Sequence, residues 1–175
     1  MSDHIAVVPY DPAWIARFEE EQARLEEALA PWLIEGVHHI GSTAIPGLSA
    51  KPIIDMLAGV RDLAQARDAC APLRTLSYVD TPHRPGIAHH FSKPSARLSE
   101  TTHGLHLTEP GSDLWRERLA FRDALRDHPA LLSGYEQLKL RLAREHPGDL
   151  VAYTAGKREF VGRVLATREL QFGDR

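Results

Sequence analysis

The sequence has few of the features that mark specialised classes of protein. Its 175 residues include one cysteine, Cys70, so no disulfide can form within the chain and a reducing compartment is expected. Its longest strongly apolar run is about four residues, far short of the roughly 20 that cross a bilayer. The first residues carry no basic or apolar stretch of the secretory kind. We therefore expect a cytoplasmic protein with no membrane association.

A surplus of positive charge is also missing. Lys and Arg number 21 against 24 Asp and Glu, which gives a formal net charge of −3. Proteins that bind nucleic acid in general usually carry a basic stripe, so such binding is not expected. The hydrophobic fraction of 43% is ordinary for a globular protein. At roughly 150 residues per domain, residues 1–175 are expected to form a single domain.

Apolar periodicity and capping residues predict an α+β fold. Strands are expected at 4–9, 34–40, 51–60, 76–80, 87–92 and 104–108. Helices are expected after Asp11-Pro12, at 63–74, and through the last third, with boundaries at Ser112 or Asp113, Pro129 and Asp149. This order predicts a sheet-bearing part at about 1–110 and a helical C-terminal layer at about 111–170.

The stretch HIGSTAIPGLSAKPIID at 39–55 gives the strongest signal for a binding site. A predicted strand ends near Gly41, whose missing side chain lets a ligand approach the backbone. Ser42 and Thr43 add hydroxyl groups beside free backbone N–H groups, a combination that suits a phosphate. Lys51 stands where such a phosphate would need a cation. The spacing of a Walker A loop is absent.

Asp55 is the strongest single candidate for a functional side chain. It shares one face of its predicted strand with Ile53 and Leu57, and both faces are otherwise apolar, so the strand is expected to be buried. A carboxylate there must be hydrogen-bonded, ion-paired or bound to a metal ion. The alternative is a structural carboxylate satisfied by a loop amide or an arginine.

Histidine is abundant, with ten residues, seven of them between positions 38 and 106. Residues three apart on a regular strand point to opposite faces, so His103 and His106 should not bind the same metal ion. Alternation places His106 with Gly104 on the less apolar face, which we assign to the site. His39, directly before the Gly-Ser loop, and His103 are candidates for lining a pocket.

Several segments resemble the GrpB family. They are VVPYDPAWIARFEEE at 7–21, HHIGSTAIPGLSAKPIIDM at 38–56, LHL at 105–107, FRDALRDHP at 121–129, YEQLK at 135–139, and the pattern of Tyr153, Lys157 and Phe160. The resemblance covers almost the whole chain. It implies a nucleotidyltransferase fold of the DNA polymerase beta type, with a mixed sheet, and a family that also occurs fused to dephospho-coenzyme A kinase.

The superfamily pattern implies roles for individual residues. A phosphate-binding Gly-Ser matches Gly41 and Ser42, and the first Asp of an Asp-x-Asp pair matches Asp55. The second carboxylate falls at Leu57, and a third falls near 105–107, where this chain offers His106. Asp55 and His106 are therefore the expected catalytic and metal-binding residues. The cofactor would be Mg²⁺ or Mn²⁺, or a transition metal such as Zn²⁺, which imidazole suits better.

Basic residues complete the expected site. Lys93 follows a predicted strand and is similar to a family position, and Arg97 is near it in sequence. Lys157 is similar to a lysine that contacts the triphosphate in related nucleotidyltransferases. Together with Lys51 and Thr43, these side chains are expected to bind phosphate or nucleotide, the alternative for each being a solvated surface charge.

Three functions are compatible with these features. The first is binding of a phosphorylated ligand, a nucleotide foremost, with a metal ion; if such a protein is catalytic, it would transfer a nucleotidyl group to a small molecule or protein. The second is a catalytically inactive binding or partner module, which the missing carboxylate at Leu57 favours. The third is a His/Asp metal-dependent hydrolase, suggested by the histidine content alone.

Overall fold

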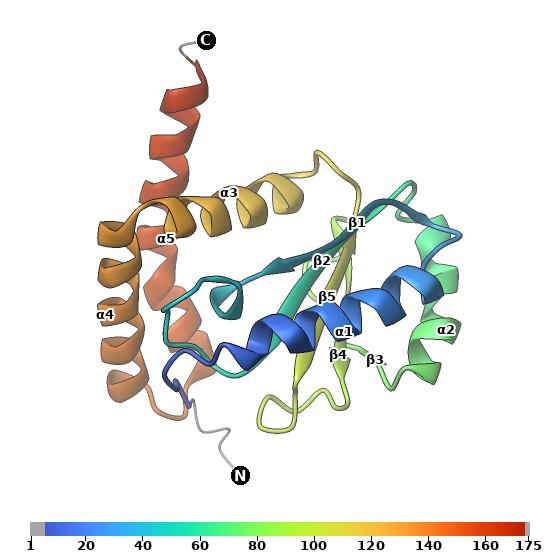
Figure 1. Cartoon of the computed structure of the whole chain (residues 1–175), viewed down its shortest axis with the longest axis horizontal. Helices are drawn as coiled ribbons and strands as arrows, with labels where there is room; N and C mark the ends of the chain where they lie inside the picture. The colour runs from blue at the N-terminus through green and yellow to red at the C-terminus, as the bar shows by residue number, and fades with distance from the viewer. Residues whose placement is uncertain (1–5, 174–175) are drawn as a thin grey trace.

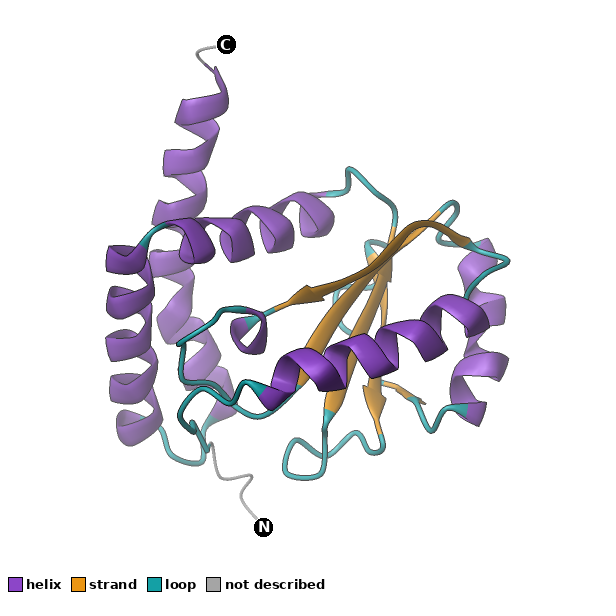
Figure 2. Cartoon of the chain, viewed as in Figure 1, coloured by secondary structure: helices purple, strands orange, loops and turns teal. Residues whose placement is uncertain are grey.

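The computed structural model describes residues 6–173 and has a five-stranded sheet at its centre (Figure 2). Its strands are β1 (Leu33–Ile40), β2 (Ile54–Val60), β3 (Val79–Asp80), β4 (Ala88–Lys93) and β5 (His103–Thr108). They lie in the order β1-β2-β5-β4-β3. β2 and β5 are parallel, and the other neighbouring pairs are antiparallel. The expected α+β class with a mixed sheet is confirmed.

The helices follow the predicted order (Figure 1). They are α1 (Ala13–Ala28), α2 (Cys70–Thr75), α3 (Asp113–Asp127), α4 (Pro129–Glu145) and α5 (Leu150–Gly173), with short 3-10 turns η1 (Ser42–Ala44) and η2 (Gln65–Ala69). Two predicted caps are formed. The Ser112 hydroxyl accepts from the Trp115 N–H, and the Asp149 carboxylate accepts from the Ala152 N–H. Across the described residues, no helix has the length and apolarity to cross a membrane.

The two faces of the sheet have different neighbours. Side chains of alternate strand residues, such as Met56 and Leu105, enter the main core, where α1 contributes Trp14. The register pairs Asp55 with Gly104, so these residues belong to the opposite face. Helix α3 packs on part of that face, where the Trp115 ring lies edge-on to His38 with ring centroids 5.2 Å apart. The C-terminal helices also form a second apolar cluster around the loop between β1 and β2, with the buried members Ile45, Leu48, Leu125 and Tyr135.

Two predicted strands are much shorter than expected. In the strand predicted at 4–9, residues 4 and 5 lie outside the described part of the chain. Among the remaining residues only Val8 forms a β-bridge, to Ala50. Pro9 has no N–H with which to continue a ladder. Of 76–80, only Val79 and Asp80 form a strand, because the helix before them ends in a turn with Ser77 at a φ of 68°.

Candidate functional site

A cavity of about 430 Å³ lies between the second face of the sheet and the C-terminal helices. Its walls come from the loop after β1, from β2, β4 and β5, and from α3, α4 and α5. The structure gathers there these predicted residues: Gly41, Ser42, Thr43, Lys51, Asp55 and Lys157. The sheet and the helical layer thus contribute to a single site.

Gly41 and Gly104 make room for the carboxylate of Asp55. A Cβ atom at residue 41 would lie 2.8 Å from Asp55 Oδ2, and one at residue 104 would lie 2.8 Å from Asp55 Oδ1. Gly41 also has a φ of 71°, in the left-handed region that side chains disfavour. Glycine is therefore needed at both positions for steric reasons, and at Gly41 for conformational reasons too.

The short turn after Gly41 is anchored from both sides. The Thr43 hydroxyl donates to the Ile53 carbonyl oxygen at 2.9 Å and lies 2.9 Å from His39 Nε2. From α3, Arg126 Nε donates to the Ala44 carbonyl oxygen at 3.0 Å. These contacts fix the turn, in which Ser42 is half-buried and lines the cavity beside Tyr135.

Asp55 is the one carboxylate among the residues that line this cavity. It is half-buried, and desolvation raises the pKa of its carboxyl group, although the charges of Lys51 and Arg118 act in the opposite direction. Neither a hydrogen bond nor an ion pair within the described residues satisfies its oxygens. This placement favours a role towards a ligand over the structural alternative.

Three lysines surround Asp55 in a weakly solvated setting. Burial, followed by the charges of the other two lysines, lowers the pKa of Lys139 to about 7. Burial and the charge of Lys51 lower the pKa of Lys157 to about 8, and burial lowers that of Lys51 too. In the described part of the chain, none of the three forms a salt bridge. With Arg118, four cations therefore face one carboxylate.

The aromatic ring of Tyr153 lies close to the ammonium groups of two of these lysines. Lys157 Nζ lies 4.4 Å and Lys51 Nζ lies 5.5 Å from the centroid of the Tyr153 ring. The aromatic face stabilises a cation without neutralising it. Lys139 Nζ lies 5.4 Å from the centroid of another ring, that of Tyr135, and also donates to the Ser49 carbonyl oxygen at 2.7 Å. The amines are thus positioned while the net positive charge is kept.

Other predicted residues lie elsewhere. Lys93 and His103 belong to the face of the sheet that packs on α1, where Lys93 Nζ lies 2.8 Å from the buried carboxylate of Glu21. Arg97 is exposed and lies 3.5 Å from Glu100. The structure does not bring these three side chains into the cavity.

His39 also lies outside the cavity. It is buried, stacks on Phe18 with ring centroids 4.6 Å apart, and lines a separate groove beside α1. Burial lowers the pKa of its imidazole to about 4. The Thr43 hydroxyl connects it to the turn, so its contact with the site is indirect.

His106 faces the same side of the sheet as Asp55 but does not line the cavity. It is 7% exposed, its Nδ1 has no hydrogen-bond partner in the described part, and burial lowers its pKa well below the usual range. His90 of β4 is its cross-strand partner, with ring centroids 4.4 Å apart, and it is His90 that lines the cavity. The predicted separation of His103 and His106 onto opposite faces is confirmed.

The arrangement of donors limits how a metal ion could be held. Across the described residues, no three His, Cys, Asp or Glu side chains are placed to hold one. A resident ion bound by protein side chains alone therefore does not fit. Mg²⁺, however, is commonly bound by one or two carboxylates together with phosphates of the substrate. Asp55 fits that second arrangement.

Several lining residues were not predicted, among them Lys139, Arg118 and His90. Lys139 carried a usable signal, because it stands between Tyr135 and Leu142 on the buried stripe of α4. A charged residue at a core position of an amphipathic helix indicates a buried polar contact. His90 could have been selected by its alternation with the core residue Phe91, and Arg118 had no such signal.

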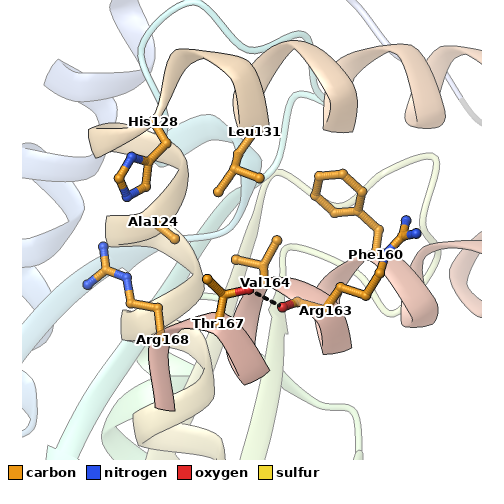
Figure 3. Close-up of a pocket in the computed structure, with 8 residues that line it drawn as sticks. All are labelled: Ala124, His128, Leu131, Phe160, Arg163, Val164, Thr167 and Arg168. Carbon is orange, nitrogen blue, oxygen red and sulfur yellow. Dashed lines mark hydrogen bonds between the residues drawn. The ribbon is translucent and has the colours of Figure 1, made fainter. Parts of the chain in front are cut away.

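A second cavity, of about 250 Å³, lies among α3, α4 and α5 (Figure 3). Leu131, Phe160 and Val164 give it an apolar lining, and the Thr167 hydroxyl is used within the helix by donating to the Arg163 carbonyl oxygen at 3.0 Å. The residues that line it include no carboxylate or lysine. The cavity around Asp55, whose lining combines a carboxylate with three lysines, is therefore the candidate functional site.

Comparison with known proteins gives consistent matches. The family model described as "GrpB protein" matches residues 4–167. The UPF0157 protein YqkA of Bacillus subtilis is 36% identical over 159 residues, which are 90% of this chain. The UPF0157 protein PA4798 of Pseudomonas aeruginosa is 40% identical over 167 residues, 93% of this chain and 67% of that protein. The chain spans about half of YqkA, 45% of its length.

Structural similarity extends over nearly the whole molecule. The crystal structure of the conserved protein GrpB from Enterococcus faecalis matches with a TM-score of 0.85 at 30% identity, covering 95% of this chain and 99% of that one. A dephospho-CoA kinase of Mycolicibacterium paratuberculosis is 29% identical over 182 residues, and the match covers 43% of the length of that kinase. The chain therefore belongs to the GrpB family and has its nucleotidyltransferase-like fold.

Proposed function

We propose that the cavity around Asp55 binds the phosphate groups of a nucleotide. The observation that supports this most strongly is that four basic side chains face one carboxylate, in a setting where burial already lowers the lysine pKa values. The negative charges of a bound polyphosphate would stabilise the ammonium form of these lysines and raise their pKa values again. The turn at Gly41 and Ser42 adds backbone and hydroxyl donors at the same wall.

A divalent metal ion would enter with this ligand. Asp55 would supply its protein ligand and the phosphates would complete its coordination, which is the usual manner of Mg²⁺ binding. Such an ion neutralises phosphate charge and polarises the phosphoryl group. The predicted partnership of Asp55 with His106 has less support, because His106 is buried and does not line the cavity, whereas the neighbouring His90 does.

Transfer of a nucleotidyl group is the activity that this ligand and fold suggest. The four cations would stabilise the departing pyrophosphate. A catalytically inactive binding module is the second candidate, and a specific observation favours it. Leu57 is fully buried and leaves Asp55 without a second carboxylate on β2.

The identity of the ligand can be narrowed with a thermal-shift panel. It would contain the four ribonucleoside triphosphates, coenzyme A and its precursors, each with Mg²⁺, Mn²⁺ or a chelator. The coenzyme A precursors are included because one relative is a dephospho-CoA kinase. A ligand at 100 times its Kd stabilises by about 2.7 kcal/mol, a shift of roughly 5–10 °C for a chain of this length.

Asp55→Asn is the informative variant, and Asp68→Asn, at an exposed position on η2, is its matched control. The metal-dependent part of the shift should disappear in Asp55→Asn and persist in Asp68→Asn. A nucleotide shift of equal size in wild type and Asp55→Asn, with and without metal, would remove the proposed metal role. The absence of a shift with every phosphorylated compound would reject nucleotide binding.

A further inference from the structure

The side of the cavity formed by β4 and β5 carries an imidazole that the nucleotide proposal does not use. His90 Nδ1 lies 2.9 Å from the Thr81 carbonyl oxygen and 2.8 Å from the Thr81 hydroxyl. A carbonyl oxygen can only accept, so Nδ1 must carry the hydrogen. In the neutral ring, this leaves the lone pair on Nε2.

His90 Nε2 has no hydrogen-bond partner among residues 6–173 and borders the space beside Asp55. A Cβ atom at residue 104 would lie 3.6 Å from His90 Nε2 and 2.8 Å from Asp55 Oδ1. Because residue 104 is glycine, that space is open to a ligand atom. A reacting group placed there would meet the carboxylate on β2 and the imidazole on β4 together.

The neighbours of His90 hold it in this orientation. The Thr81 hydroxyl also lies 3.0 Å from the Ser92 hydroxyl, and the Thr81 N–H donates to the His90 carbonyl oxygen at 2.9 Å. His106, the cross-strand neighbour of His90 on β5, packs beside the ring, with centroids 4.4 Å apart. Such fixed hydrogen-bond support is typical of an imidazole that must keep one tautomer.

We propose that this region is a second subsite, for an acceptor that bears a hydroxyl group, and that His90 Nε2 takes the proton of that hydroxyl. The proposal rests on the proposed nucleotide binding and gives the site an acceptor class. It also supplies a base where the chain has Leu57 in place of a second carboxylate.

The step balances as a simple displacement. The acceptor oxygen forms a bond to the α-phosphorus of the nucleotide while the bond to pyrophosphate breaks. The hydroxyl proton moves to His90 Nε2, and pyrophosphate departs towards the lysines. The products are a nucleotidyl ester of the acceptor, pyrophosphate and a proton, which His90 later releases to solvent.

The test compares two nucleophiles with ATP and Mn²⁺. Glycerol must lose a proton when it attacks, whereas fluoride has none to lose, so a base assists only the first. Product formation is followed by mass spectrometry and pyrophosphate release. His90→Asn keeps a donor near the Nδ1 position and removes Nε2, His90→Gln is the second variant, and His89→Asn is the control on the opposite face, where His89 contacts the Leu63 carbonyl oxygen.

The wild-type protein and His89→Asn should form both products. His90→Asn and His90→Gln should lose glycerol transfer by about 100-fold or more, with fluoride transfer and the ATP-induced thermal shift unchanged. Equal loss of both nucleophiles in a variant that still binds ATP would overturn the assignment of a base. Wild-type protein that binds ATP and forms neither product would overturn it too, while the absence of ATP binding would reject the nucleotide proposal itself.

Discussion

Replacing Lys139 by methionine should make the protein more stable at pH 6 while weakening its binding of nucleotide. Lys139 is 2% exposed, and its pKa is about 7, well below its value in an unfolded chain, because burial and the charges of Lys157 and Lys51 disfavour the ammonium form. Methionine removes that charge and keeps most of the apolar stem. Its cost is an unpaired carbonyl at Ser49, about 1–3 kcal/mol.

The sign of the pH dependence follows from proton counting. Between pH 7 and the unfolded value near 10.5, the unfolded chain holds more protons at Lys139 than the folded one, so wild-type stability rises with pH. Below pH 7 Lys139 is charged in the folded protein, so the full free-energy cost of its buried ammonium group is present. At about 1.4 kcal/mol per pH unit, the advantage of Lys139→Met should shrink by roughly 2–3 kcal/mol between pH 6 and pH 9.

Urea unfolding at pH 6 and pH 9 measures this difference directly. Arg141→Met, at an exposed position of the same helix, is the control and should change stability by less than about 0.5 kcal/mol at both values. A difference between Lys139→Met and wild type that stays constant from pH 6 to pH 9 would refute the reasoning. It would mean that Lys139 is not held in an unfavourable charged state.

Three further predictions follow from other parts of the molecule. Glu21→Gln should lower the free energy of unfolding by about 1–3 kcal/mol at neutral pH. Burial raises the pKa of Glu21, but hydrogen bonds from Lys93 and Tyr78 outweigh burial, so the net pKa is lowered. The stability difference between Glu21→Gln and the wild type should therefore fade in unfolding experiments as the pH falls through the pKa of Glu21. Gly104→Ala should abolish the metal-dependent nucleotide shift, because its methyl group would lie 2.8 Å from Asp55 Oδ1, whereas Gly162→Ala, with open space around it, should not. Ser112→Ala should cost about 1 kcal/mol in thermal unfolding by removing the cap of α3.

Local chemistry explains which parts of the fold were predictable from the sequence. Ser112 and Asp149 cap their helices by hydrogen bonds to residues three positions later, so the local sequence alone was enough to predict where these helices begin. Strand alternation likewise placed His106 and Gly104 on the face of Asp55. The predicted strand at 76–80 failed because the turn at Ser77 delays pairing until Val79, a tertiary effect.

The site was predictable only where its residues adjoin in sequence. Gly41, Ser42 and Asp55 come from one loop and the strand after it, and their proximity follows from that connection. Arg118 and Lys139 enter from helices whose docking depends on the apolar cluster at Ile45 and Leu48. Lys93 follows Phe91 on the core face, so alternation alone would have directed it away from Asp55.

The central claim is that the lysine cluster binds polyphosphate, and calorimetric titration of Lys157→Gln with ATP and Mg²⁺ tests it most directly. Arg158→Gln, at the exposed neighbouring position of the same helix, is the matched control. A charged hydrogen bond is worth about 1.5–3 kcal/mol, so Kd should rise by roughly 10- to 100-fold in Lys157→Gln and stay unchanged in Arg158→Gln. Equal affinity in the wild type and both variants would contradict the account.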